Sequence, residues 1–147
     1  MEDNQELSKL KVHIIDYDEV PGDLFPFFVS YRMFFDEQIK CYGFFLEQDL
    51  VAVTAVIPDE PNYDGGFVPV GCPIIYVFEV REDMRRKGLG YECAQVLINN
   101  VIEEDTIQLC CSPFVQPFWS KVGFEIMFFD QSLYMNKMVL KKEDKEG

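Results

Sequence analysis

The chain has 147 residues, the length of one ordinary domain, and 48% of them are hydrophobic, which is enough to fill one core. We therefore expect a single domain over residues 1–147. The formal charge of −13 has the wrong sign for binding nucleic acid by counterion release, and the longest uncharged run, residues 106–120, is too short to cross a bilayer. We expect neither nucleic acid nor membrane as a partner.

The N-terminal quarter of the chain begins acidic and becomes aromatic. Residues 1–8 predict a flexible start without a secretory signal, which indicates a cytoplasmic protein. Residues 10–16 alternate between apolar and polar side chains and predict a first strand, with His13 on its polar side. Residues 17–38 mix carboxylates with aromatic rings and contain prolines, which predicts one or two short helices. These rings could line a site for a cationic amine or simply pack in the core.

Two further strands, residues 41–47 and 50–57, are expected to form a hairpin with the turn Gln48-Asp49. The irregular segment that follows, residues 58–73, contains four prolines and three glycines. A connection of this length either covers a binding cleft or is an ordinary surface loop.

Five cysteines are spread over the chain in apolar surroundings: Cys41, Cys72, Cys93, Cys110 and Cys111. They lack the paired CxxC spacing of a metal site. We expect reduced thiols that pack in the core, and no bound metal.

A basic turn lies between a predicted strand and a predicted helix. Residues 74–80 form an apolar run that suits a buried strand, and residues 88–104 carry one apolar helical face. Between them stands Arg85-Arg86-Lys87-Gly88-Leu89-Gly90. A glycine turn that opens a helix presents unpaired backbone N–H groups and the positive end of the helix dipole, which together bind anions.

The same turn concentrates positive charge. Four of the 13 lysines and arginines fall within seven positions, namely Arg81, Arg85, Arg86 and Lys87. Because a chain this acidic repels anions over most of its surface, the cluster favours a local polyanion as ligand. A charged surface loop without a ligand is the alternative.

The C-terminal third predicts strands around one short helix. Residues 107–111 suit a buried strand, and residues 113–122 suit a helix that ends at Gly123 as its C-terminal cap. Residues 124–129 and 132–140 predict a final hairpin, whose apolar edge could support a homodimer. Residues 141–147 predict a solvated tail.

Two of these segments resemble the GNAT superfamily of N-acetyltransferases. The turn from Arg85 to Gly90 is similar to its pyrophosphate-binding signature, Arg/Gln-x-x-Gly-x-Gly/Ala. Residues 112–124 are similar to its second motif, with Phe118, Lys121, Gly123 and Phe124 in agreement, whereas Ser112 and Trp119 depart from it. The resemblance implies an α/β (α+β) fold: a mixed, mostly antiparallel sheet of about seven strands flanked by helices, with the fourth and fifth strands splayed.

The resemblance also implies acetyl-CoA as co-substrate and no metal. In such enzymes the central strand pairs with the pantetheine arm, and the amides of the glycine turn hold the pyrophosphate. Carried over to this chain, the cofactor-binding residues are Phe78, Val80, Arg85, Arg86, Lys87, Gly88, Leu89, Gly90, Tyr91, Ser112, Phe118, Trp119 and Lys121.

The catalytic side chains that the resemblance implies are less complete. Family members often place a base at the positions of Ile74 and Tyr76 and a tyrosine acid at that of Trp119, so here only Tyr76 can exchange a proton. Glu79 is the nearest carboxylate on the central strand, and a β-bulge could bring it to the side of Tyr76. We therefore select Glu79 and Tyr76 as catalytic candidates. The alternative is that Glu79 pairs with a basic side chain while Tyr76 packs in the core.

Two functions follow from this sequence. The first is an N-acetyltransferase in which a primary amine attacks acetyl-CoA directly in a ternary complex. A cationic acceptor suits the acidic chain: a small-molecule amine, a polyamine, a lysine side chain or a protein N-terminus. The second is a domain of the same fold that binds acyl-CoA without turnover and acts as a sensor or interaction module.

Overall fold

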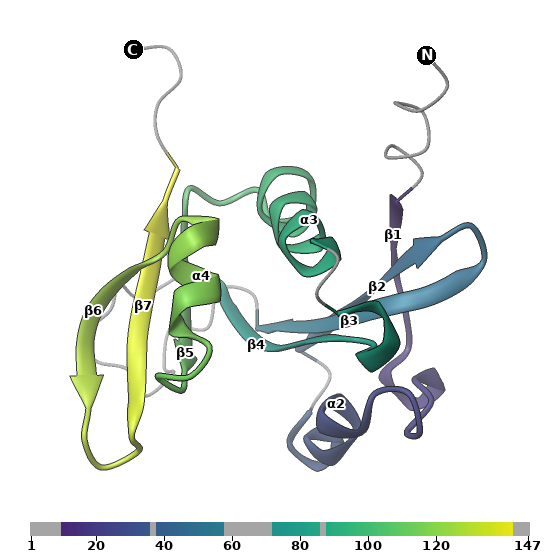
Figure 1. Cartoon of the computed structure of the whole chain (residues 1–147), viewed down its shortest axis with the longest axis horizontal. Coiled ribbons are helices and arrows are strands. Elements are labelled where there is room, and N and C mark those ends of the chain that lie inside the picture. Colours follow the sequence, from purple (N-terminus) through teal and green to yellow (C-terminus); the bar gives the residue numbers. More distant parts are fainter. Residues whose placement is uncertain (1–9, 36–37, 58–71, 86–87, 143–147) are drawn as a thin grey trace.

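The computed structural model describes residues 10–35, 38–57, 72–85 and 88–142. Its centre is a seven-stranded sheet in the order β1-β2-β3-β4-β5-β7-β6 (Figure 1). Only β4 and β5 run parallel, and the other neighbours are antiparallel. The strands are β1 (Leu10–Ile14), β2 (Lys40–Leu46), β3 (Asp49–Ile57), β4 (Ile74–Val80), β5 (Thr106–Cys111), β6 (Glu125–Asp130) and β7 (Met135–Lys141). The predicted mixed, mostly antiparallel sheet is confirmed.

Short helices lie on both sides of this sheet. Figure 1 shows α2 on one side of the central strands and α3 on the other. The helical segments are η1 (Tyr17–Glu19), α2 (Pro26–Ser30), η2 (Arg32–Phe34), η3 (Glu82–Met84), α3 (Leu89–Val96), the π-helical turn η4 (Leu97–Val101) and α4 (Gln116–Val122). The short helices predicted between the first two strands are present, and the helix predicted to reach residue 104 ends at Val101.

Two hydrophobic clusters form the core, one on each face of β4. The larger cluster joins α3 and α4 to the sheet and includes Ile75 and Val80 of β4. The smaller one gathers the aromatic residues around α2 and includes Val77. One face of β4 therefore packs against the α3 side of the molecule, and the other face packs against the α2 side.

A β-bulge in β4 changes which side chains share a face. Ala55 pairs with Val77 and the next residue of β3 pairs with Ile75, so Tyr76 is an extra residue between two pairs. The ring of Tyr76 packs with the α2-side cluster, as does Val77, whereas Ile75 packs with the α3-side cluster. Strict alternation fails at this point, and Tyr76 and Glu79 come to the same side of the sheet.

The parallel pair β4 and β5 separates after its first residues. Their ladder consists of two pairs, Ile74 with Gln108 and Ile75 with Leu109. Beyond these pairs, aromatic rings on the α3 side stand beside the diverging strand: the ring of Phe78 lies 5.3 Å from that of Trp119 and 6.1 Å from that of Phe118. The predicted splay of the fourth and fifth strands is confirmed.

Several predicted boundaries are wrong: the first strand ends at Ile14 and not at residue 16, α4 begins at Gln116 and not at residue 113, and β7 begins at Met135 and not at residue 132. Leu46 pairs with Asp49, so the hairpin loop is Glu47-Gln48 and not Gln48-Asp49, with Glu47 in the left-handed region at φ 61°. The predicted tail begins too early, because Lys141 ends β7 and the Lys142 Nζ donates a hydrogen bond to the Ile102 carbonyl (2.6 Å). This ammonium therefore caps the C-terminal end of η4, where the helix dipole favours a cation. The predicted tail 1–8 and residues 143–147 lie outside the described residues.

The cysteines are free and mostly buried, as predicted. Burial raises the pKa of the Cys41 and Cys93 thiols to about 12 and that of Cys111 to about 11. Since the thiolate is the reactive form, these three side chains are poor nucleophiles at neutral pH.

We expect the folded protein to react slowly with a disulfide reagent at pH 8, with Cys110 labelled first because it alone of the five is not fully buried. Unfolding in guanidinium should release all the remaining thiols at once. Mass spectrometry of timed samples would identify the labelled residues. Rapid labelling of Cys41 or Cys93 in the native protein would contradict the buried placement of these thiols.

Candidate active site

The N-terminus of α3 is open to an anion. Gly88 is the N-cap residue, with φ 78°, and no side chain caps the helix. Its carbonyl accepts the first helical hydrogen bond, from the Glu92 N–H at 3.2 Å. The preceding N–H groups of the first turn, at Leu89, Gly90 and Tyr91, have no acceptor inside the helix. They point outward with the positive end of the helix dipole.

The two glycines of this turn serve different purposes. A Cβ added at Gly88 would meet no atom within 4 Å, so the space beside this residue is open. A Cβ added at Gly90 would lie 3.3 Å from Val80 Cγ2 and 3.5 Å from Phe118 Cε1. Gly88 therefore supplies the left-handed conformation and leaves room above the amides, whereas Gly90 allows α3 to pack closely on β4 and α4.

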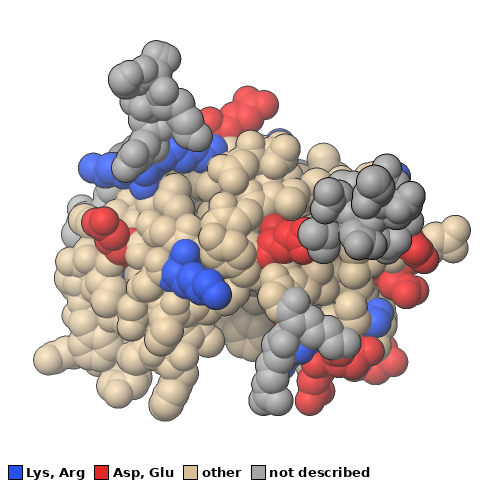
Figure 2. Space-filling model, turned by 45° about the horizontal axis from the view of Figure 1, so that its top comes forward, with Lys and Arg blue, Asp and Glu red and all other residues tan. Residues whose placement is uncertain are grey.

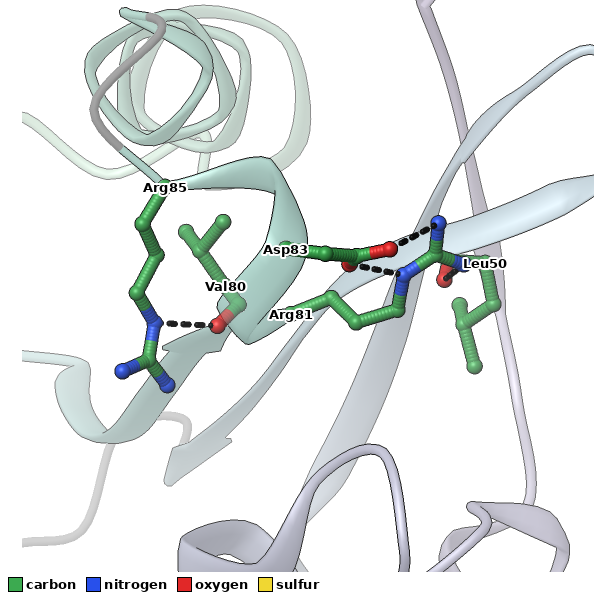
Figure 3. A network of polar contacts seen from close by, with 5 residues as sticks. All are labelled: Leu50, Val80, Arg81, Asp83 and Arg85. Atoms are coloured by element: carbon green, nitrogen blue, oxygen red, sulfur yellow. Dashed lines mark hydrogen bonds and ion pairs between the residues drawn. The ribbon is translucent and has the colours of Figure 1, made fainter.

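The basic cluster of this turn is only partly available to a ligand. Arg81 binds within the protein, with its Nε 2.7 Å from Asp83 Oδ1 and its Nη1 3.2 Å from the Leu50 carbonyl. Arg85 turns the other way, and its Nε donates to the Val80 carbonyl at 2.8 Å (Figure 3). Half of the Arg85 side chain remains exposed. Arg86 and Lys87 lie outside the described residues.

Helix α4 brings a second basic residue to the start of α3. The Lys121 Nζ lies over the ring of Tyr91, 5.3 Å from its centroid. Tyr91 belongs to the first turn of α3, so this cation–π pair stands beside the open amides. Ser112 lies between β5 and α4, where its carbonyl accepts the Val115 N–H at 3.2 Å. The structure thus brings Tyr91 and Lys121 together, and it gives Ser112 a role in the turn before α4.

Trp119 is part of the aromatic packing beside the splayed strands. It is 6% exposed and meets the rings of Phe78, Phe118 and Phe124 edge to face, at 5.3, 4.9 and 5.5 Å. Its indole can donate a hydrogen bond but cannot exchange a proton as a phenol does. At this position the chain therefore offers a packing residue and no acid.

Tyr76 lies on the opposite face, against the aromatic residues of the α2 side. Its ring meets that of Tyr31 at 5.8 Å and that of Phe35 at 6.1 Å. Burial, together with the neighbouring Tyr31, raises the pKa of Tyr76 above its ordinary value of 10.0. The phenol is therefore protonated at neutral pH, so it can donate a proton or a hydrogen bond and is not a base.

Glu79 is buried, at 5% exposure, and its carboxylate is occupied by the protein itself. Its Oε1 accepts the Phe28 N–H at 2.7 Å, and its Oε2 accepts the Phe27 N–H at 3.4 Å. Its Oε2 also lies 3.6 Å from Arg85 Nη2. The ion pair that the sequence left open as an alternative is present, and the bulge brings Glu79 to the side of Tyr76.

The link from Glu79 to α2 was missed by sequence reasoning, although a signal for it exists. Helix α2 starts at Pro26 after Phe25, which has no side-chain acceptor for the first amides. Because Phe28 in the first turn is buried, its amide needs an acceptor from elsewhere in the chain. The sequence shows that need but does not show which residue meets it.

Among the described residues, no group of three or more His, Cys, Asp and Glu side chains is arranged to hold a metal ion. Within the same part of the chain, every helix is too short or too polar to span a membrane.

No known family model and no curated protein matches the sequence. Solved structures do match its fold. A Bacillus subtilis acetyltransferase in complex with CoA superimposes with a TM-score of 0.68 at 18% identity, over 92% of this chain and 100% of that one. A GNAT family acetyltransferase from Elizabethkingia anophelis with acetyl-CoA bound gives 0.62 at 13% identity, over 91% and 99% of the two chains.

A third match is AAC(6′)-Ib in complex with paromomycin and acetyl-CoA, with a TM-score of 0.67 at 14% identity, over 91% of this chain and 94% of that one. The three structures match 91–92% of this chain, although few of their residues are identical to it. The seven-stranded order, the parallel pair that splays and the helix that starts at its open end are therefore those of a known architecture. The chain has the fold of the GNAT acetyltransferases.

Proposed function

We propose that the protein transfers an acetyl group from acetyl-CoA to a primary amine. The observation that carries this proposal is the uncapped N-terminus of α3 at Gly88, directly beside the splay of β4 and β5. A polyanion that also carries an extended arm fits such a pair of features: its phosphates bind the amides, and its arm follows the unpaired edge of β4. The fold as a whole is shared with proteins crystallised with CoA or acetyl-CoA, which supports this choice of ligand.

The described residues fit coenzyme A in charge and shape. The amides of Leu89, Gly90 and Tyr91 would hold the pyrophosphate, and the exposed half of Arg85 and the Lys121 ammonium supply positive charge nearby. Arg86 and Lys87 are proposed to add to it. The Val80 carbonyl already accepts a hydrogen bond from Arg85, so contact with the pantetheine arm depends mainly on the backbone of Phe78.

The reaction needs two proton transfers. Because pH 7 lies about three units below an amine pKa near 10.4, the amine is almost fully protonated, and removing its proton costs roughly 4 kcal/mol. Protonating the leaving thiolate, whose pKa is cysteine-like and near 8.5, stabilises it by only about 2 kcal/mol at pH 7. When bound, acetyl-CoA supplies an activated thioester. We assign the protonated Tyr76 phenol to the departing sulfur and the deprotonation of the amine to water near Tyr76 and Glu79.

The acceptor class follows from charge. Asp16, Asp18, Glu19 and Asp23 are exposed around η1 and the start of α2. Figure 2 shows acidic side chains gathered on the half of the molecule that carries β1 and α2. A cationic amine is attracted to such a surface, and the half-exposed ring of Phe27 offers a cation–π contact. We propose a cationic primary amine: a small molecule, a polyamine, a lysine side chain or a protein N-terminus.

Calorimetric titration with acetyl-CoA, combined with a free-thiol assay over a panel of amines, tests this proposal. The panel should contain a polyamine, an amine-rich sugar antibiotic, a lysine peptide and a peptide with a free N-terminus. Binding with amine-dependent thiol release would support the enzyme. Absence of binding would overturn both the enzyme and the cofactor site.

A second candidate is a sensor or interaction module that binds acyl-CoA without turnover. The observations that favour it are the indole of Trp119 in place of an acid and the occupied carboxylate of Glu79. It predicts binding of acetyl-CoA in the calorimeter and no thiol release with any amine in the panel.

We also propose a homodimer through the edge strand β6. Ile126, Met127 and Phe129 are 48%, 45% and 39% exposed, and the lower left of Figure 2, on the β6–β7 side of the molecule, shows mainly uncharged side chains. Light scattering after gel filtration should give twice the monomer mass of 17.2 kDa, and Ile126→Lys should restore the monomer. His13→Lys, on the opposite edge strand, is the matched control and should leave the dimer intact. A wild-type protein that is monomeric at every concentration would contradict this assignment.

A further inference from the structure

Helix α2 begins at the surface with Pro26 and Phe27 and has no side-chain cap of its own. Phe28 is fully buried, and the residue before the helix, Phe25, cannot accept a hydrogen bond through its side chain. The amides of Phe27 and Phe28 lie in the first turn, where a helix has no acceptor of its own. A helix of five residues has little intrinsic stability, so its position depends on tertiary contacts.

Glu79 meets this need from 51 residues further along the chain. Its two oxygens accept both amides, at 2.7 Å from Phe28 and 3.4 Å from Phe27. A negative charge at the start of a helix also interacts favourably with the helix dipole. Since Glu79 is on β4, this contact fixes α2 to the central strand.

The same carboxylate reaches the turn that precedes α3. Arg85 Nη2 lies 3.6 Å from Glu79 Oε2, while Arg85 Nε holds the Val80 carbonyl at 2.8 Å. Three groups that only donate hydrogen bonds therefore face one side chain that only accepts them. A glutamine of the same shape cannot replace it, because its NH₂ group would face either the Phe28 amide or both the Phe27 amide and the Arg85 guanidinium.

Helix α2 in turn supports Tyr76. Phe27 of α2 packs on Tyr31 with ring centroids 4.9 Å apart, and Tyr31 meets Tyr76 edge to face at 5.8 Å. A shift of α2 would therefore displace the rings that hold the phenol. The chain of contacts runs from the Arg85 turn through Glu79 and α2 to Tyr76.

We infer that Glu79 is a positioning residue, which fixes the acceptor-side helix α2 relative to the cofactor turn. It does so by binding the Phe27 and Phe28 amides of α2 and Arg85 of the turn. It acts on the reaction through α2 and Tyr76 and not as a base. This inference rests on the proposed function for its kinetic part. Its structural part, the capping of α2 by a distant carboxylate, can be measured without any substrate.

The test compares Glu79→Gln with Thr54→Val. Thr54 is fully buried on the neighbouring strand, and its Oγ1 donates to the Val77 carbonyl of β4 at 2.7 Å, a hydrogen bond that involves no residue of α2. Both variants lose a buried hydrogen bond on the same part of the sheet. Any difference between them therefore reports on α2 and not on general stability.

Hydrogen exchange read by mass spectrometry comes first. In Glu79→Gln, the amides of residues 27–31 should exchange about 10-fold faster than in the wild type, while the strand amides keep their relative protection. In Thr54→Val, the amides of residues 27–31 should not exchange faster relative to the rest of the protein. Unchanged protection of α2 in Glu79→Gln would overturn the inference, whether or not the protein is an acetyltransferase.

Kinetics then separate positioning from base catalysis. Glu79→Gln should raise the KM for the amine by about 10-fold and keep the wild-type shape of the pH profile of kcat/KM. A profile that changes shape, with α2 still protected, would assign proton transfer to Glu79 and overturn the positioning role. If no amine is acetylated, the proposed function fails, and the exchange data alone decide whether Glu79 holds α2.

Discussion

Replacing Gly88 with asparagine is expected to weaken acetyl-CoA binding by about 100-fold, close to 3 kcal/mol. The backbone at this position is left-handed, at φ 78°, and asparagine tolerates that conformation better than other side chains. The fold should therefore survive. The new side chain would occupy the open space beside the first amides of α3, where nothing lies within 4 Å at present. Isothermal calorimetry measures the affinity, and thermal unfolding checks the fold.

Gly123→Ala is the control for backbone strain. Gly123 also has a positive φ, at 129°, and a Cβ there would lie 3.2 Å from Leu140 Cδ1. This variant should be less stable than Gly88→Asn and still bind acetyl-CoA within about threefold of the wild type, because strain alone does not close the site. If Gly88→Asn binds acetyl-CoA as well as the wild type does, the amides of α3 are not the pyrophosphate site.

The sequence predicted best those features that depend on neighbouring residues. The glycine turn, the helix behind it and Gly123 at the end of α4 are local, because each follows from the backbone preferences of a few adjacent residues. The splay of β4 and β5 came from the resemblance to GNAT enzymes and is confirmed by a ladder of two pairs. The salt bridge from Arg81 to Asp83 is also local, at two residues' distance, and could have been expected from the same stretch.

Other features could not be derived from the residue types alone, because they depend on the alternation of strand faces and on contacts between distant segments. One extra residue in β4, at Tyr76, exchanges the faces of the strand, and such a bulge was expected only from the resemblance to GNAT enzymes, because no residue type near Tyr76 indicates it. The place of Glu79 depends on that parity and on α2, which comes much earlier in the chain. Carboxylates are ordinarily expected at the surface, so a buried one that caps a distant helix is visible only in the folded structure.

Replacing Tyr76 with phenylalanine is expected to lower kcat about 30-fold, which corresponds to the roughly 2 kcal/mol needed to protonate the sulfur, and to leave acetyl-CoA affinity unchanged. The substitution removes only the hydroxyl, so the ring keeps its contacts with Tyr31 and Phe35. Tyr42→Phe is the matched control, because burial raises the pKa of Tyr42 as well, whereas its side chain packs with the α3-side cluster. Steady-state kinetics on both variants, with the best amine of the panel, measure the difference.

The pH dependence follows from the direction of the Tyr76 shift. Its pKa lies above the ordinary 10.0 because burial disfavours the phenolate. The protonated phenol therefore predominates up to about pH 10 and is lost only as the pH rises through the raised pKa. The wild-type rate should rise with the neutral fraction of the amine up to about pH 10 without an earlier fall. The rate of Tyr76→Phe should stay furthest below it at a pH well under about 8.5, where the leaving sulfur most needs a proton. A rate for Tyr76→Phe within about twofold of the wild type would remove Tyr76 from the reaction and leave solvent water to protonate the sulfur.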